Sequence, residues 1–316
     1  AIMNYREMAD AVNVSVELKE AGFQVSQLCC SRPSCFDFAA RKNDKTLLVK
    51  VNFEADAFSF QDAQELKVIA DRLSAASLII SQHAHGKPLE DDTVYSRYSI
   101  FVITAKTLKN IASQTANPLV YAGPGGYTVE VDGALIEKKR KKLGLSIGKL
   151  AAMIGVSRRT LYGYERGMAR ASVTSAYKLA QTLGVPVVKP INILGHVKKY
   201  RRCRARKMRH DFAGRVQLQK IFSKFAFCDI FPVEKAPFDF VINVPNERYA
   251  IVGSVAVNGE KNMDNRIDEF LSICLVVCAY PVLITNGQKH SGKDVHCVGM
   301  DELAEIRTPE DLIASF

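Results

Sequence analysis

The spacing of apolar and polar positions predicts alternating helices and strands in the first third of the chain. Apolar residues recur at helical spacing from residue 5 to residue 21, where Gly22 provides a helix end. Within 35–53, two apolar runs joined by Asn43-Asp44 indicate a pair of strands, and Ser59 is the expected N-cap of a helix over 59–73. Further strands are expected over 23–28, 77–81 and 99–104, and a further helix over 107–112. The pattern predicts an α/β unit.

The same order of elements returns near the C-terminus. A strand pair with Asp239 follows the pair with Asp37 by 202 residues, and Ile306 follows Ile111 by 195 residues. The two separations differ by seven residues, and loops of different length in the two copies would account for this difference. The repeated elements are a helix over 214–227, two strands within 238–255, a helix over 263–277, a strand over 280–286, and a segment over 295–306 that matches 100–111. We therefore predict two copies of one α/β unit.

Residues 134–184, between the two copies, contain no β-rich run and are expected to form a packed group of helices. A linker rich in Pro and Gly over 117–133 leads into them through a short strand and a turn at Asp132-Gly133. The segment thus separates into a central, all-helical domain.

A tight Gly155-Val156 turn joins two helices of this group, whose expected N-caps are Ser146 and Ser157. Gly155 suits a backbone position where a side chain would crowd, and Val156 and Leu161 can fill the interface between the helices. The positions expected to face the core are Leu150, Ala151, Ile154, Tyr177, Leu179, Ala180 and Leu183. This spacing is typical of a helix-turn-helix, whose second helix enters the major groove of DNA.

These residues resemble the Cro/phage-repressor (XRE-type) DNA-binding domain family over about 134–185. The motifs that carry the resemblance are the GLS start, the LAAMIGVS turn, the YERG end of the second helix and the LAQTLGV helix. The resemblance implies that DNA faces Ser157, Arg158, Arg159, Thr160 and Tyr162, with Glu165 and Arg166 making structural or backbone contacts. Arg158 and Arg159 could contact guanine, and Lys149, Ser157 and Thr160 could hold phosphate.

Charge separates the middle of the chain from its flanks. Residues 135–210 hold 20 Lys and Arg but only two acidic residues, a net charge of +18, whereas the remainder carries −8. A solvated charged face normally mixes signs, so this imbalance favours a polyanion-binding module. Eight of the bases lie within 198–209, including Lys198, Lys199, Arg201 and Arg202, and such bases bind phosphates by releasing counterions.

The flanking copies resemble the restriction-endonuclease-like fold of archaeal junction resolvases and RecB-type nucleases. In that family an Asp and a following (Asp/Glu)-x-Lys hold a divalent metal and activate water. Here Asp37 and Lys50 are present, but Leu48 stands where the carboxylate is expected. Gln61 or Gln64 could match a polar helix residue of the family, and Glu54 or Asp56 could in principle move into reach.

The second copy departs further from the nuclease pattern. Asp239 remains, while Ile251 and Gly253 are expected at the places of the acid and the lysine. We therefore expect Asp37 and Asp239 to serve as hydrogen-bonding carboxylates and predict no catalytic residue. If the protein were active, Asp37 and Lys50 would carry the activity.

The composition of the chain also bears on its expected cellular location and on its expected binding partners. No window resembles a membrane span, the N-terminus lacks a signal-like segment, and the eight cysteines include no Cys-x-x-Cys pair. We expect a soluble cytoplasmic protein with no cofactor, no metal and no membrane contact. The expected parts are a nuclease-like domain (1–116), a linker with a short strand (117–133), the helix-turn-helix domain (134–186), a basic linker (187–210) and a degenerate nuclease-like domain (211–316).

The whole arrangement is similar to a group of archaeal HTH-type transcriptional regulators. The resemblance implies a regulator that binds double-stranded DNA sequence-specifically as a homodimer, since two half-sites require a two-fold partner. One alternative is a metal-dependent, structure-selective nuclease targeted by the helix-turn-helix. Another is a nucleoid or scaffold protein that binds DNA without sequence preference.

Overall fold

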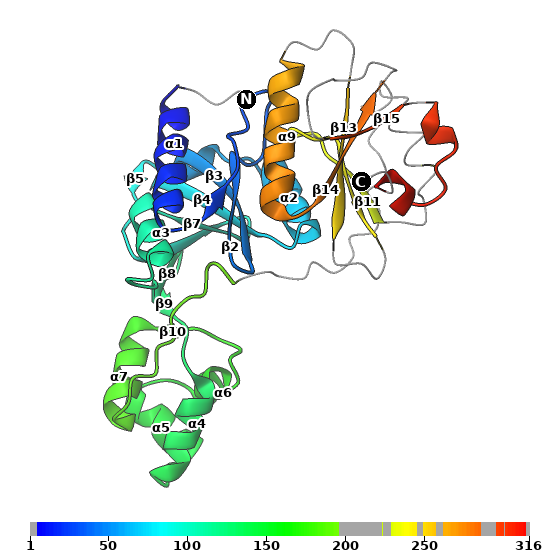
Figure 1. Ribbon diagram of the computed structural model, residues 1–316. Coiled ribbons are helices and arrows are strands. Elements are labelled where there is room, and N and C mark those ends of the chain that lie inside the picture. The colour runs from blue at the N-terminus through cyan, green and yellow to red at the C-terminus, as the bar shows by residue number, and fades with distance from the viewer. Residues whose placement is uncertain are drawn as a thin grey trace. The chain divides into compact units, whose positions relative to one another are not determined.

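The computed structural model (Figure 1) describes residues 5–195, 223, 229–244, 249–256, 262–285, 295–299 and 301–313. It divides into two compact units, each described separately below. The first comprises Ala1–Phe53, Ala57–Ile79 and Leu194–Phe316, and the second comprises Glu54–Asp56 and Ile80–Ile193. None of the helices in the described ranges is long and apolar enough to cross a membrane.

The N-terminal part of the first unit follows the predicted pattern of helices and strands. Gly22, with φ +87°, ends the first helix, and Asn43, with φ +56°, forms the predicted turn between two antiparallel strands. Ser59 caps the next helix, because its side chain accepts from the Asp62 N–H. The elements are α1 (Tyr5–Glu20), β1 (Gln24–Val25), β2 (Phe38–Lys42), β3 (Lys45–Glu54) and α2 (Phe60–Arg72).

The C-terminal part of the first unit repeats this arrangement. Its sheet has the order β11-β12-β13-β14-β15, antiparallel up to β13 and parallel from there. The elements are β11 (Asp229–Pro232), β12 (Phe240–Asn243), β13 (Ala250–Val255), α9 (Met263–Val277), β14 (Tyr280–Thr285) and β15 (His296–Gly299). The helix expected over 214–227 falls outside the described residues, apart from residue 223. The strand of the segment predicted to match 100–111 is present as β15, but the helix that follows it is only a short 3-10 helix, η3 (Glu302–Ala304).

The two copies contact each other reciprocally within the first unit. Oε1 of Glu65 on α2 accepts from the N–H groups of Glu234 and Lys235, at 2.7 and 2.8 Å. Oε1 of Glu269 on α9 accepts from the N–H groups of Cys30 and Ser31, both at 2.9 Å. Each pair of donors lies in the loop before the aspartate of the other copy, Asp239 or Asp37. We call these two carboxylates the latch glutamates, since each fixes the opposite loop.

Two aromatic rings face each other at the same contact. The ring centroids of Phe36 and Phe238 are 6.4 Å apart, and each residue immediately precedes the aspartate of its copy. Equivalent residues that contact each other indicate an approximate two-fold relation between the copies. The copies therefore cover each other's faces within one chain.

The second unit joins a small sheet to the helices of the central domain. β6 pairs antiparallel with β7 and parallel with β8, and β8, β9 and β10 form an antiparallel series. The segment predicted as a linker therefore contains the hairpin β8–β9. The elements are β5 (Lys87–Pro88), β6 (Thr93–Arg97), β7 (Ile100–Ile103), α3 (Ala105–Ala112), β8 (Val120–Gly123), β9 (Gly126–Val129) and β10 (Ala171–Ser172), with β4 (Ala76–Ala84) shared between the units.

Two local expectations for this region are wrong. Asp132 and Gly133 form no turn, because Asp132 is the N-cap of a helix and its Oδ1 accepts from the Leu135 N–H at 3.0 Å. The central domain also contains the two-residue strand β10, although no strand was expected over 134–184. The strand β10 forms because it pairs antiparallel with β9 of the hairpin.

Candidate nucleic-acid interface

Four helices form the central domain around one hydrophobic core. Their N-caps are Asp132, Ser146, Ser157 and Ser172, and each side chain accepts a backbone N–H three residues on. Two of these caps, Ser146 and Ser157, confirm the sequence prediction. The helices are α4 (Gly133–Lys142), α5 (Ile147–Ile154), α6 (Arg158–Glu165) and α7 (Val173–Leu183).

The turn between α5 and α6 depends on backbone conformation at Gly155. Its φ is +77°, a left-handed value that side chains other than glycine rarely adopt. A Cβ there would meet only Nζ of Lys178, at 3.8 Å, so the expected crowding is absent. Leu161 is fully buried and Val156 packs against the same core, as predicted.

One predicted core position is wrong. Tyr177 is 63% exposed, and the preceding residue, Ala176, is buried instead. On α7 the buried face follows Ala176, Leu179 and Leu183, with Ala180 packed beside them. This three-to-four spacing leaves Tyr177 on the solvent side, where its hydroxyl accepts from Nε2 of Gln181 at 2.8 Å.

A buried ion pair ties α4 to the end of α6. Nε and Nη2 of Arg140 donate to the two carboxylate oxygens of Glu165, at 2.6 and 3.0 Å. The Glu165 hydrogen bond raises the pKa of Arg140, which also donates to the Leu145 carbonyl. A Cβ at Gly133 would lie 2.3 Å from the Glu165 carbonyl oxygen, so glycine permits this close approach. Glu165 therefore has a structural role, and Arg140 is not part of the exposed basic surface.

The N-terminal half of α6 presents its polar residues to solvent. Ser157, Arg158 and Arg159 are exposed, Thr160 is half-buried, and Ser157 Oγ lies 2.8 Å from Thr160 Oγ1. Among the described residues, no hydrogen bond or ion pair engages either guanidinium group. The predicted outward projection of Arg158 and Arg159 is therefore present.

The two arginines differ in their surroundings. A Cβ at Gly148 would lie 2.6 Å from Nε of Arg158, so the Arg158 guanidinium lies against the first turn of α5. Nothing comparable covers Arg159. Further along α6, the Arg166 guanidinium carbon lies 5.5 Å from the centroid of the exposed Tyr162 ring.

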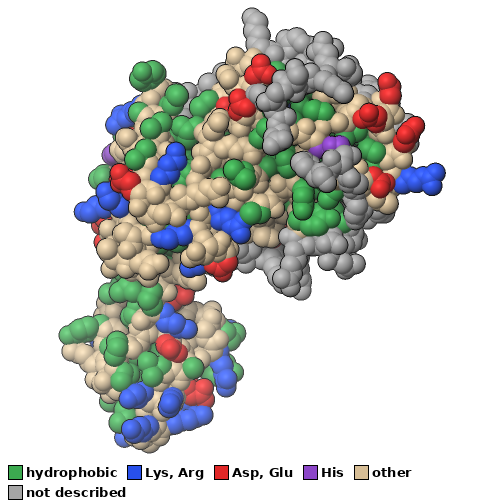
Figure 2. Space-filling model, in the orientation of Figure 1, with side chains coloured by type: hydrophobic (Ala, Val, Ile, Leu, Met, Phe, Trp, Pro, Cys, Tyr) green, Lys and Arg blue, Asp and Glu red, His purple; other side chains and the backbone are tan. Residues whose placement is uncertain are grey.

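The neighbouring helices α4 and α5 also carry exposed basic residues. Lys149 on α5 and Lys138 and Lys142 on α4 are exposed. In the face drawn in Figure 2, Lys and Arg side chains gather over α4 and α5 at the bottom of the view. We call this set the basic face: Lys138, Lys142, Lys149, Ser157, Arg158, Arg159, Thr160, Tyr162 and Arg166. The predicted contacts Lys198, Lys199, Arg201 and Arg202 lie outside the described residues.

The nuclease-like site of the first copy is closed by its own hydrogen bonds. Lys50 Nζ donates to Oδ1 of Asp37 at 2.7 Å, and the Val51 N–H donates to Oδ2 at 2.6 Å. Burial would lower the pKa of Lys50, but the Asp37 carboxylate raises it above its ordinary value. Both carboxylate oxygens are thus engaged in holding β3 against the Asp37 loop.

These residues do not fit the divalent metal that the fold family implies. Asp37 is 1% exposed, and Leu48 is fully buried at the position of the second carboxylate. Glu54 and Asp56 accept from the backbone of Gly86 and His85 instead. Across the described ranges, no group of three or more His, Cys, Asp and Glu side chains could hold a metal ion.

In the second copy, the expected counterparts of the nuclease residues are wrong by one position. The Asp37 N–H donates to the Val49 carbonyl, and the Asp239 N–H donates to the Gly253 carbonyl. Val51 and Val255 likewise make equivalent N–H contacts to the two aspartates. The counterpart of Lys50 is therefore Ser254, not Gly253, and that of Leu48 is Val252, not Ile251. The shift arises because the connection between the two strands is two residues longer in the second copy.

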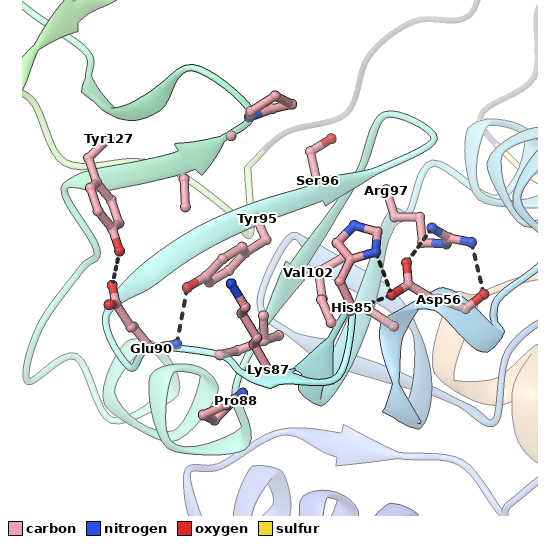
Figure 3. Close-up of a pocket in the computed structure, with 16 residues that line it drawn as sticks. Asp56, His85, Lys87, Pro88, Glu90, Tyr95, Ser96, Arg97, Val102 and Tyr127 are labelled. Atoms are coloured by element: carbon pink, nitrogen blue, oxygen red, sulfur yellow. Dashed lines mark hydrogen bonds and ion pairs between the residues drawn. The ribbon is translucent and has the colours of Figure 1, made fainter.

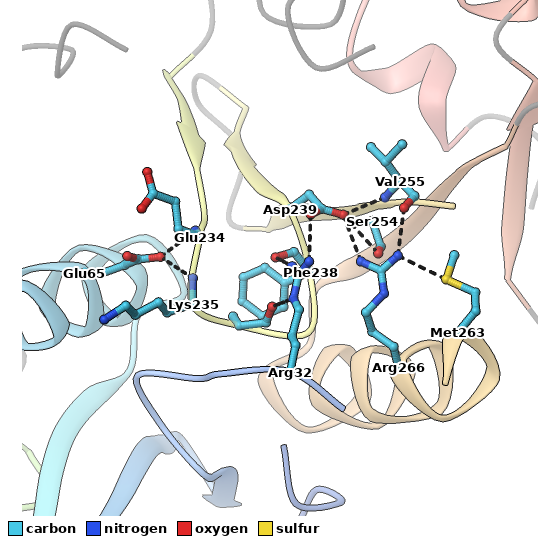
Figure 4. A network of polar contacts seen from close by, with 11 residues as sticks. Arg32, Glu65, Glu234, Lys235, Phe238, Asp239, Ser254, Val255, Met263 and Arg266 are labelled. Atoms are coloured by element: carbon cyan, nitrogen blue, oxygen red, sulfur yellow. Dashed lines mark hydrogen bonds and ion pairs between the residues drawn. The ribbon is translucent and has the colours of Figure 1, made fainter. Parts of the chain in front are cut away.

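Two arginines replace the lysine at this second site (Figure 4). Arg32 Nη1 lies 3.0 Å from Oδ1 of Asp239, and Arg266 Nη1 lies 3.2 Å from Oδ2. Ser254 Oγ also donates to Oδ2, at 3.3 Å. Asp239 and Arg266 are almost completely buried, so the site is an internal ion-pair network. Sequence reasoning did not find these arginines, because they lie 207 and 27 residues from Asp239.

Comparisons with known proteins agree with both parts of this architecture. Residues 8–118 match the PD-(D/E)XK superfamily domain, and residues 136–189 match a helix-turn-helix family. The predicted resemblance to a nuclease-like fold and to an XRE-type domain is thereby confirmed.

Relatives that match most of the chain are HTH-type transcriptional regulatory proteins of archaea. One from Methanosarcina barkeri is 31% identical over 94% of this chain and 92% of the relative. One from Methanocaldococcus jannaschii is 30% identical over 89% of this chain and 87% of the relative. A shorter match, with a TM-score of 0.16, is to the crystal structure of the restriction-modification controller protein C.AhdI from Aeromonas hydrophila, 34% identical over 17% of this chain and 80% of that one.

Proposed function

The chain belongs to the family of archaeal HTH-type transcriptional regulatory proteins, and from this premise we propose that its basic face binds double-stranded DNA sequence-specifically. The observation that supports the proposal is the pair of exposed arginines at the start of α6. The guanidinium groups of Arg158 and Arg159 have no hydrogen-bond or ion-pair partner among the described residues. Both acidic residues of the helical domain are already paired, Glu165 with Arg140 and Glu137 with Lys141. The face is therefore left with net positive charge.

The surroundings of the two arginines support different contacts. Arg159 is free to extend toward base edges, where a guanidinium can donate to O6 and N7 of guanine. Arg158 lies against the first turn of α5, near Lys149 and the cap Ser146, where a helix N-terminus favours a phosphate. We assign Arg159 to base contact and Arg158, Lys149, Ser157 and Thr160 to the DNA backbone. Tyr162 and Arg166 stack on each other beside them.

We also propose that the protein acts as a homodimer. Each chain supplies one helix-turn-helix, and two half-sites on a duplex require a second chain related by a two-fold axis. The flanking nuclease-like copies would then support the DNA-binding domains instead of cleaving DNA. This part of the proposal is supported by the lack of a second carboxylate at Leu48 and by the closed Asp37–Lys50 pair.

The proposed sequence-specific binding is tested by first selecting the fragments of the source genome that the protein binds. The affinities of variants for the selected site and for random DNA are then compared. We expect the double variant Arg158→Ala with Arg159→Ala to bind selected and random DNA equally. Lys45→Ala, which removes one exposed positive charge from the first unit, should retain the preference. Equal binding of both duplexes by the unmodified protein would instead support the nonspecific scaffold alternative.

The nuclease alternative has its own test. The protein is incubated with linear and branched DNA in the presence of magnesium or manganese. We expect no cleavage above that of an Asp37→Ala preparation. Cleavage that this substitution abolishes would overturn the non-enzymatic assignment.

A further inference from the structure

A cavity of about 620 Å³ lies within the second unit, away from the basic face. Its volume falls within the range of small-molecule sites, roughly 300–1,000 Å³. One wall is formed by β5 and β6, and the other by the hairpin β8–β9, which contributes Ala122, Gly123, Pro124 and Tyr127. Apolar groups including Pro88, Val102 and Pro124 supply much of the lining.

Most charged groups that line the cavity are already paired (Figure 3). Nη1 of Arg97 donates to Oδ1 of Asp56 at 2.7 Å, and Nη2 donates to the Asp56 carbonyl at 2.8 Å. Oδ2 of Asp56 accepts from the His85 N–H. Oε2 of Glu90 accepts from the Tyr127 hydroxyl at 2.8 Å, and this hydrogen bond raises the pKa of Tyr127. These pairs fix the walls.

Lys87 and Tyr95 are among the lining residues whose side-chain donors have no acceptor among the described residues. The exposed side chain of Lys87 forms no ion pair or hydrogen bond with any of them, while its backbone pairs with β4. Tyr95 accepts the Glu90 N–H at 3.1 Å, which leaves its own O–H without a described acceptor. In Figure 3 the side chains of Lys87 and Tyr95 converge on the same space. An ammonium beside a hydroxyl donor is suited to an anionic oxygen.

We propose that this cavity binds a small organic anion, with its carboxylate or phosphate on Lys87 and Tyr95 and its apolar body between β6 and the hairpin β8–β9. An anion of this kind supplies an acceptor for the Lys87 ammonium and the Tyr95 hydroxyl and covers the apolar groups of Pro88, Val102 and Pro124. The site does not depend on the DNA contacts proposed above, because it lies on other elements.

The position of the cavity links the site to the helix-turn-helix. Val129 and Val131, at the end of the hairpin and just after it, belong to the hydrophobic core of α4–α7. The Tyr121 hydroxyl on β8 donates to Glu130 at 2.7 Å, and the Arg170 guanidinium lies 3.5 Å from the Tyr121 ring centroid. The hairpin wall of the cavity is thus fixed to the helical domain, as an effector site of a regulator requires.

Direct binding to the full chain, without DNA, tests the site. Isothermal titration is carried out with 2-naphthoate and its neutral counterpart 2-naphthamide, and separately with inorganic phosphate and phenyl phosphate to distinguish the two acid groups. We expect the naphthoate to bind more tightly than the amide. Lys87→Met, which keeps the alkyl chain and removes the charge, should weaken naphthoate binding by about tenfold and leave amide binding unchanged.

Two further variants keep the result interpretable. Lys45→Met, a charge removal in the first unit, should leave both affinities unchanged. Ala122→Trp should fill the cavity and weaken the naphthoate and the amide together, with unchanged circular dichroism as the check on folding. Equal affinity of Lys87→Met and the unmodified protein for every anion, or no binding by any probe, would overturn the proposal. Failure of the DNA experiments would leave these results unaffected, so the two proposals can fail separately.

Discussion

Arg158 and Arg159 are adjacent in sequence, yet their side chains lie in different places. Arg158 packs against Gly148 of α5, whereas no described side chain engages Arg159. A helix turns by about 100° per residue, so neighbouring side chains leave it in different directions. The sequence predicted that both face outward but left open which contacts base and which contacts phosphate.

We expect Arg159→Ala and Arg158→Ala to have different effects on DNA binding. Loss of a base contact should reduce the preference for the selected site over random DNA by about 1–3 kcal/mol. Loss of a phosphate contact should weaken binding to both duplexes alike. It should also reduce the slope of log K against log salt concentration by about one. Titrations of both duplexes at several salt concentrations measure the two quantities. If the two variants behave identically, the assignment is wrong.

The aspartates at equivalent positions of the two copies also differ in what their removal would expose. Asp37 balances Lys50, while Asp239 balances two arginines, one of them completely buried. We expect Asp239→Ala to lower the free energy of unfolding by about 3–5 kcal/mol, because it leaves buried positive charge unpaired. Asp37→Ala should cost less, since Lys50 is closer to solvent. Urea unfolding of the two variants provides the comparison, and equal losses would contradict it.

At the scale of elements, the close approach of α4 and α6 depends on one glycine. We expect Gly133→Ala to lower the free energy of unfolding of the helical domain by about 1–3 kcal/mol, because its Cβ would overlap the Glu165 carbonyl. Gly125→Ala, in the turn of the hairpin β8–β9, is the matched control because no atom lies within 4 Å of its Cβ position. Thermal unfolding followed by the helical circular dichroism signal measures the stability of both variants. A Gly133→Ala protein as stable as the control would show that the helices shift without cost.

The latch glutamates predict a local effect on the opposite copy. Glu65→Ala removes the acceptor of two backbone N–H groups, which costs about 1–3 kcal/mol for each donor left unsatisfied. We expect faster hydrogen exchange at Glu234 and Lys235, with Cys30 and Ser31 unchanged. Glu269→Ala should give the opposite pattern, and Glu20→Ala, at the end of α1, should change neither. Exchange that rises equally at both loops would mean that the copies open together.

The elements that sequence analysis predicted correctly are those with local signals. Asn43, Ser59, Ser146 and Ser157 lie at the predicted turn and caps, because turn and cap chemistry involves residues three or four apart. The hairpin β8–β9 was missed because its Pro and Gly residues indicate a linker equally well. Arg32 and the latch glutamates contact residues that lie 169 to 239 positions away, and Arg266 contacts Asp239 from 27 positions away, so no local spacing in one sequence reveals them.

At the scale of the whole molecule, we predict that the basic segment 198–209 adds affinity for DNA without adding sequence preference. Replacing the eight bases within 198–209 by Gln should weaken binding to selected and random DNA by the same factor and flatten the salt dependence. The preference between the duplexes should be retained, because α6 is unchanged. Binding isotherms across a salt series measure slope and preference together. Loss of preference in this variant would assign base contacts to the segment.

The reciprocal contact between the copies has a consequence for stoichiometry. Each nuclease-like copy contacts its counterpart within the same polypeptide. One chain therefore carries two nuclease-like copies but a single helix-turn-helix domain. In the proposed homodimer, two chains therefore bring four nuclease-like copies for two helix-turn-helix domains.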